Sequence, residues 1–238
     1  MHFNKDTMRE LLKIALPMVV SQGAFAVMIF TDRYFMSQID PTHMAAALGG
    51  GVACFFSFCF FSGLLSYGNA MAAQYLGAGE PEKCPKVVTQ GFIMAMMSIP
   101  ALVVITYFVS GIFENMGHDS RQVELERTYY TILMLGIVVT LAKICLSSYF
   151  AGIARTHVVM ICDVFGLIIN VPLSYVMVFG KLGFPALGIV GAGVSTIVAT
   201  ILGFLAFVSF YLAKEHREKF RVMESFHLDW GILRRFLR

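Results

Sequence analysis

The sequence predicts an all-α, polytopic membrane protein built as a bundle of six transmembrane helices, and three observations support this fold class. Hydrophobic residues make up 58% of the 238-residue chain and charged residues only 14%, whereas soluble domains carry roughly 25% charged residues. Apolar runs of about 20 residues, the length that spans a bilayer, recur along the whole chain. Because the hydrocarbon core offers no water, each run must pair its own backbone amides, which a helix does.

The six spans are predicted in chain order from these apolar runs, at about 14–36, 44–76, 88–110, 129–151, 158–180 and 188–213. They are too long and too evenly apolar for strands of a membrane barrel, which alternate and run for about 10 residues. The first run is also too long for the core of a signal peptide, and mixed charges precede it, so we expect it to stay in the membrane. Pro17 should kink this first helix or loosen its first turns.

The distribution of Lys and Arg predicts that both ends of the chain face the cytoplasm. The basic residues of the predicted inner side include Lys5, Lys13, Lys83, Lys86, Arg155 and seven in the tail. Those of the outer side are Arg33, Arg121, Arg127 and Lys181. Residues 214–238 are therefore expected to form a cytoplasmic basic linker, which is either an amphipathic helix on the inner leaflet or a simple connector.

Asp32 is the first residue of the predicted spans whose charge is costly inside a bilayer. It lies near the end of the first span, and a carboxylate inside a membrane helix costs about 2.5–3.5 kcal/mol. Such residues normally face a protein interior or a wet cavity, so Asp32 is a candidate proton or cation site. Alternatively, it reaches the outer headgroups or pairs with Arg33. Gln22, Phe25 and Met28 precede it in helical steps and are predicted to line the same cavity.

Asn170 and Ser174 lie four residues apart on one face of the fifth span. The first and fifth spans run in the same direction, and at 1.5 Å per residue Asp32 and Ser174 should lie at similar depth. We therefore expect one cavity to hold Asp32, Ser174 and, about one turn deeper, Asn170. The alternative is that Asn170 and Ser174 make ordinary interhelical hydrogen bonds.

Lys143 in the fourth span and Asp163 at the start of the fifth should lie at nearly the same depth, across a short turn. A buried pair of opposite charges would offset much of the desolvation cost of either charge. The sequence thus predicts a structural or gating ion pair. A direct substrate or proton role, or snorkelling of Lys143 toward the inner interface, are the alternatives.

Several function classes find no support in the sequence. It contains no phosphate-binding loop, no nucleophile–base arrangement and no metal-ligand spacing, so we expect neither an enzyme nor a bound cofactor or metal. The five cysteines show no disulfide framework and are interpreted as reduced packing residues. A net charge of +3 is too small to indicate nucleic acid as a partner. The lipid bilayer is the partner that the composition predicts.

Five features together suggest a known family. They are Pro17 before Asp32 in the first helix, and the segments SYGNAMAAQYLGAG, AGIART, INVPLSYVMVFG and GFPALGIVGAGVSTIVAT. In order and spacing along nearly the whole chain, the sequence resembles the N-terminal lobe of multidrug and toxic compound extrusion (MATE) transporters.

This resemblance implies a secondary antiporter of the plasma membrane, most simply the bacterial inner membrane, which exports amphipathic organic cations in exchange for protons or sodium. Asp32 and Asn170 would then carry the coupling ion; some members have an acid where this chain has Ser174. Full members have two six-helix lobes, so the second lobe is expected to be fused, separate or a second copy. The alternatives are a lipid-linked oligosaccharide flippase of the same superfamily, which would need a strongly cationic cavity, and a non-transporting membrane scaffold.

Overall fold

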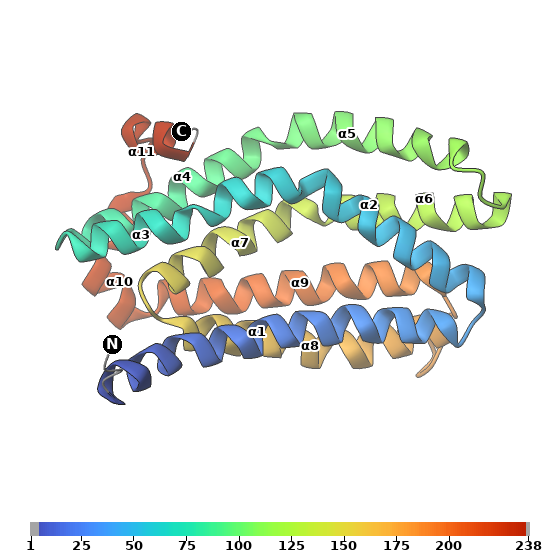
Figure 1. Cartoon of the computed structure of the whole chain (residues 1–238), viewed down its shortest axis with the longest axis horizontal. Coiled ribbons are helices and arrows are strands. Elements are labelled where there is room, and N and C mark those ends of the chain that lie inside the picture. The colour runs from blue at the N-terminus through green and yellow to red at the C-terminus, as the bar shows by residue number, and fades with distance from the viewer. Residues whose placement is uncertain (1–4, 237–238) are drawn as a thin grey trace.

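The computed structural model describes residues 5–236 as a bundle of α-helices joined by short turns, with no strand among these residues (Figure 1). The long helices are α1 (Lys5–Ser37), α2 (Pro41–Ser66), α3 (Gly68–Gly77), α4 (Cys84–Met97), α5 (Ile99–Ile112), α6 (Ser120–Leu135), α7 (Ile137–Gly152), α8 (Thr156–Phe179) and α9 (Ile189–Leu212). The short elements are the helices α10 (Lys214–Phe220) and α11 (Trp230–Phe236) and the 3-10 turns η1 (Pro81–Lys83), η2 (Phe113–Asn115) and η3 (Val222–Ser225). The ends of the predicted lobe and linker, residues 1–4 and 237–238, lie outside the described residues.

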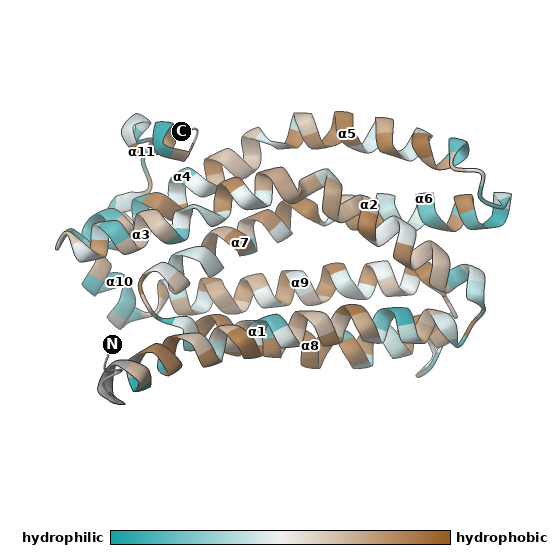
Figure 2. Ribbon diagram, viewed as in Figure 1, coloured by the Kyte–Doolittle hydropathy of each residue, from teal (hydrophilic) through white to brown (hydrophobic). Residues whose placement is uncertain are grey.

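The predicted all-α bundle is confirmed. By length and composition, the described chain offers six spans when each bent helix pair is counted as one. Four are the stretches Leu11–Ser37, Pro41–Gly77, Thr156–Phe179 and Ile189–Leu212. Hydrophobic residues run along the long helices, and hydrophilic residues gather toward the ends of the bundle (Figure 2). This distribution suits a bundle that crosses a membrane along its long axis.

The two remaining spans are bent near their middles. The axis turns by 41° between α4 and α5 and by 49° between α6 and α7. Pro100, at the start of α5, removes a helical hydrogen-bond donor just after the first bend. At the second bend, Gly136 lies so close to α9 that a Cβ atom would come within 2.7 Å of Ile197. In contrast, α1 is helical without interruption through Pro17.

The fourth span begins earlier than predicted. The third and fourth predicted spans, 88–110 and 129–151, leave residues 114–127 in an outer loop between them, but α6 already starts at Ser120. Asp119 caps this helix, because its carboxylate accepts a hydrogen bond from the backbone N–H of Arg121 at 3.1 Å. A polar first turn with a good cap continues the helix beyond its apolar part, and hydropathy alone does not detect such an extension.

Two groups of helices pack against each other. One group contains α1, α8 and α9, which lie side by side, with α8 in contact with both of the others (Figure 1). The other contains α2 to α7, in which α2 packs along α6 and α7 packs on α3 and α4. Contacts of α9 with α6 and α7 join the two groups. The first described turns of α1 and the helix α11 lie at the same end of the bundle, as an even number of spans requires.

The tail after α9 folds back onto this end of the bundle. Ile232 and Phe236 of α11 are buried in a cluster with Met71 and Val87. Arg235 donates hydrogen bonds to the hydroxyl of Tyr75 at 3.0 Å and to Oε1 of Gln74 at 2.6 Å. Part of the apolar face that was expected at a membrane surface is therefore used inside the protein. Trp230, which is 66% exposed, stays outside this contact.

Candidate functional site

The Asp32 carboxylate is buried between three helices. It lies on α1 with an exposed fraction of 5%. Ser174 of α8 donates a hydrogen bond to Oδ1 at 2.8 Å, and Thr196 of α9 donates one to Oδ2 at 3.0 Å. Asp32 therefore neither reaches bulk water at the rim nor turns to lipid. Its negative charge faces hydroxyl groups in the protein interior, where hydrogen bonds to a charged group are strong.

Asn170 extends this polar group one turn along α8. Its side-chain amide donates to Oγ1 of Thr196 at 3.4 Å, so Asn170 reaches Asp32 through Thr196. The amide is fully buried, and its Oδ1 atom has no hydrogen-bond partner among the described residues. The structure thus brings together Asp32, Asn170 and Ser174, the three residues that the sequence analysis grouped.

Thr196 completes the site, and the sequence analysis did not single it out. It is partly buried and lies in the apolar helix α9, next to the fully buried Ser195. A hydroxyl pair within a membrane span is a weak signal, because Ser and Thr often bond to their own helix backbone. Thr196 does this as well, at 3.0 Å from the carbonyl of Ala192.

The three residues predicted to line a cavity with Asp32 differ in exposure. Phe25 is 54% exposed and Gln22 is also exposed, while Met28 is half-buried. Gln22 lies ten residues before Asp32, about 2.8 helical turns, so the two side chains do not share one face. The face of α1 that packs inward carries Ser21 and Ala24 instead. Within this chain, Gln22 and Phe25 therefore do not enclose the carboxylate.

Two grooves lie outside the Asp32 site. One of about 740 Å³ lies between α5 and α6 and is lined by residues such as Tyr107 and Arg127, with none of the predicted site residues. The other, of about 500 Å³, is lined by Gln38, Val178 and neighbouring residues at the ends of α1 and α8. Val178 is one turn beyond Ser174 on α8, about 6 Å along the helix axis.

Lys143 and Asp163 form the ion pair that the sequence predicted. The Lys143 ammonium on α7 lies 2.8 Å from Oδ1 of Asp163 on α8, and Ser21 of α1 donates a hydrogen bond to Oδ2 of the same carboxylate. The two side chains are 25% and 18% exposed, so the pair is partly open and not fully buried as expected. Together with Ser21, the pair joins α1, α7 and α8, which fits a structural or gating contact.

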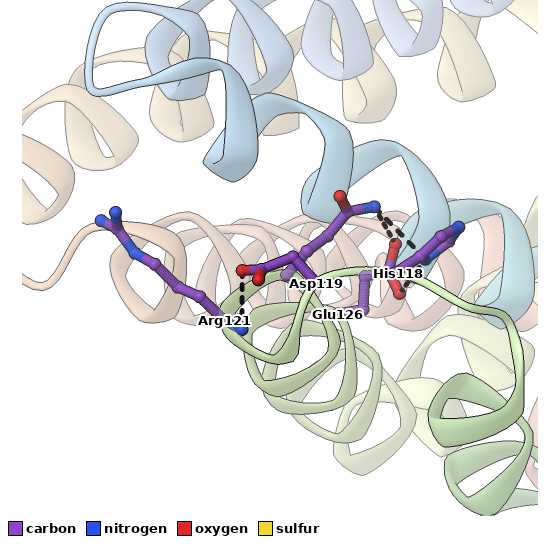
Figure 3. Close-up of polar contacts among 5 residues, drawn as sticks. His118, Asp119, Arg121 and Glu126 are labelled. Atoms are coloured by element: carbon purple, nitrogen blue, oxygen red, sulfur yellow. Dashed lines mark hydrogen bonds and ion pairs between the residues drawn. The ribbon is translucent and has the colours of Figure 1, made fainter.

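Glu126 is a buried acid that the sequence analysis had assigned to an outer loop. It is 1% exposed and lies on α6, where it accepts hydrogen bonds from Gln122 at 2.9 Å and from His118 at 3.1 Å (Figure 3). Its carboxylate faces Gly49 of α2, where an added Cβ atom would come within 2.5 Å of Oε1. In the sequence, the run Gly49–Gly51 could have indicated this contact, because small residues in a membrane helix let another helix approach closely.

Comparisons with known proteins show which family and fold this chain resembles. The MatE family model matches residues 17–176. The multidrug resistance protein NorM of Vibrio vulnificus (strain CMCP6) is 30% identical over 228 residues, which cover 95% of this chain and 50% of the relative. The multidrug resistance protein MdtK of Edwardsiella ictaluri (strain 93-146) is 30% identical over 232 residues, covering 96% and 50%.

A solved structure shares the fold. It is a multidrug resistance MATE family transporter of the MOP superfamily in an outward-facing conformation, with a TM-score of 0.82 and 19% identity. The match covers 96% of this chain and 50% of the solved chain. The chain therefore spans about half the length of the curated relatives and of the solved structure that it matches.

Proposed function

The chain belongs to the MatE family, and on that premise we propose that it is one six-helix lobe of an ion-coupled multidrug efflux transporter. It is a multi-pass membrane protein and, like its relatives, not an enzyme. The proposed location is the bacterial inner membrane, with both ends of the six-helix lobe on the cytoplasmic side. The exported substrates would be amphipathic organic cations, in exchange for protons or sodium.

The buried carboxylate of Asp32 carries this proposal. Its described partners are the hydroxyls of Ser174 and Thr196, and no Lys, Arg or His of the described chain forms an ion pair with it. A carboxylate that is held by neutral donors can change its charge by taking up a proton or a small cation, whereas a fixed counter-ion would prevent this. Asp32 is therefore proposed as the coupling site.

The unpartnered oxygen of Asn170 supports the same role. Oδ1 of Asn170 and the Asp32 carboxylate are buried, and Oγ1 of the partly buried Thr196 bonds to both side chains, so the three residues gather oxygen atoms at one place. Oxygen ligands of this kind suit a hard cation, and the Asn170 oxygen could also accept a hydrogen bond from a protonated acid. The groove at Val178 would supply the path from outside.

The second lobe is the other part of the proposal. The relatives have about twice the length of this chain, and residues 214–238 are proposed as the cytoplasmic linker toward a second lobe. Six spans leave both ends on one side, so a fused lobe, a separate chain or a second copy could complete a parallel repeat about an axis normal to the membrane.

Dye efflux from cells that express the chain tests the function. Asp32→Asn should abolish ion-coupled efflux of a cationic dye while the protein remains folded and inserted. Asp119→Asn is the matched control, because Asp119 is exposed and asparagine is an equally good helix cap. If the Asp32→Asn variant exports dye at the normal rate and with normal pH dependence, Asp32 is not the coupling site.

A further inference from the structure

The helices α1 and α8 exchange two serine–aspartate hydrogen bonds. Ser174 of α8 donates to Asp32 of α1, and in return Ser21 of α1 donates to Asp163 of α8. On each helix the serine and the aspartate are eleven residues apart, which is about three turns or 16 Å. The helix pair therefore holds two carboxylates of similar construction at two depths.

The two carboxylates differ in their second partner. Asp32 receives a second hydroxyl from Thr196, whereas Asp163 receives the ammonium of Lys143 at 2.8 Å. Lys143 is the only charged residue in the sequence of α7, and α9 has none. On α1 the stretch from Leu16 to Thr31 is also uncharged, and on α8 the nearest titratable neighbour is the Cys162 thiol. Among the described residues, Lys143 is therefore the one that forms an ion pair with Asp163.

The Lys143 side chain passes close to α9. On α9, a Cβ atom added to Gly203 would lie 3.6 Å from Cε and 3.8 Å from Nζ of Lys143. The lysine therefore passes α9 at Gly203, one of the three glycines of this helix. With Lys143 25% exposed and Asp163 18% exposed, the pair is not sealed from small solutes.

We propose that Asp163 is a second carboxylate site for a small cation of the primary-ammonium type, and that Lys143 is its covalently tethered occupant. A tethered group has an effective concentration of about 1 mM or more, so it excludes free cations from the carboxylate. Asp32 then remains the single exchangeable carboxylate of the α1–α8 pair. Only this last consequence rests on the proposed function; the binding property of Asp163 does not.

The test removes the lysine by mutation and adds a soluble amine in its place, on the purified chain in detergent. Lys143→Ala should lower the thermal unfolding midpoint at pH 8 by about 5 °C or more, because it leaves a poorly solvated charge unpaired. Propylammonium chloride should restore at least half of this loss with a saturable dose dependence. Propanol, which lacks the charge, and tetramethylammonium chloride, which lacks N–H donors, should not.

Three further variants complete the experiment. Lys143→Ala/Asp163→Asn should not respond to propylammonium, and Lys143→Arg should melt near the wild type. Lys143→Gln is titrated in the same way in case Lys143→Ala does not fold. The proposal is overturned if propylammonium restores neither single variant more than it changes the double variant, or if tetramethylammonium restores them equally. In an Asp32→Asn background the response should persist, which separates this result from any failure of the efflux test.

Discussion

Asp32 and Ser174 are 142 positions apart in the chain, and their side chains meet at 2.8 Å across the interface of α1 and α8. The hydrogen bond exists only while the two helices keep their register, because both groups are buried and belong to different helices. The charge of Asp32 and the packing of α1 are therefore coupled by one contact. Transport models for this chain can build on that coupling.

Removing the hydroxyl of Ser174 should destabilise the protein. Ser174→Ala takes one donor from a buried carboxylate, and we expect a loss of about 1–3 kcal/mol in the free energy of unfolding. Thermal or denaturant unfolding in detergent measures it. Ser209→Ala is the control, since Ser209 is exposed on α9 and bonds only to the Leu205 carbonyl of its own helix. Equal stability of both variants would mean that Ser174 does not support Asp32.

Two glycines of α2 should respond to alanine in opposite directions. At Gly50 an added Cβ atom would come within 2.9 Å of the Glu126 backbone oxygen, so α6 would have to move away. Gly50→Ala should therefore cost about 1–3 kcal/mol. At Gly63 nothing lies within 4 Å, and Gly63→Ala should stabilise the helix by up to about 1 kcal/mol. Unfolding midpoints that shift together would contradict this close contact between α2 and α6.

The buried acid of α6 should matter more than its exposed neighbour. Glu126→Ala leaves the Gln122 amide without its acceptor and opens a cavity beside Gly49, so we expect a loss of about 2–4 kcal/mol. Glu124→Ala, at an exposed position of the same helix, should change stability by less than about 0.5 kcal/mol. Unfolding of the two variants side by side provides the measurement. A Glu126→Ala protein as stable as Glu124→Ala would show that the acid is not a packing element.

Much of the fold was predictable because a bilayer leaves few choices for a long apolar run. The six spans and the grouping of Asp32, Asn170 and Ser174 follow from span length, direction and the rise of 1.5 Å per residue. The pairing of Lys143 with Asp163 followed in the same way, from two charges at one depth. These features depend on position along the membrane normal, which a sequence specifies well.

The features that were missed depend on rotation about a helix axis and on contacts between distant segments. Gln22 was assigned to the face of Asp32, but ten residues of helix turn it aside. Thr196 and Glu126 were not singled out, since the groups that they contact belong to α1 and α2, which lie far away in the sequence. The docking of Phe236 likewise depends on a site formed by α3 and α4. Hydropathy along one segment carries no information of this kind.

The tail should loosen in acid because of His216, which lies on α10 beyond the last span. Its ring is buried, with Nε2 2.9 Å from the Tyr149 hydroxyl and Nδ1 3.2 Å from Arg155. Burial, and then the charges of Arg155 and Lys219, lower the pKa of His216 to about 4. The unfolded chain, with a pKa of about 6.5, therefore takes up this proton first. The free energy of unfolding is therefore highest above pH 6.5 and should fall by about 2–3 kcal/mol toward pH 4.

Unfolding measured across this pH range tests the role of His216. His216→Gln should flatten this part of the unfolding profile, whereas His227→Gln, at an exposed position, should not. Identical profiles for the two variants would refute the assignment.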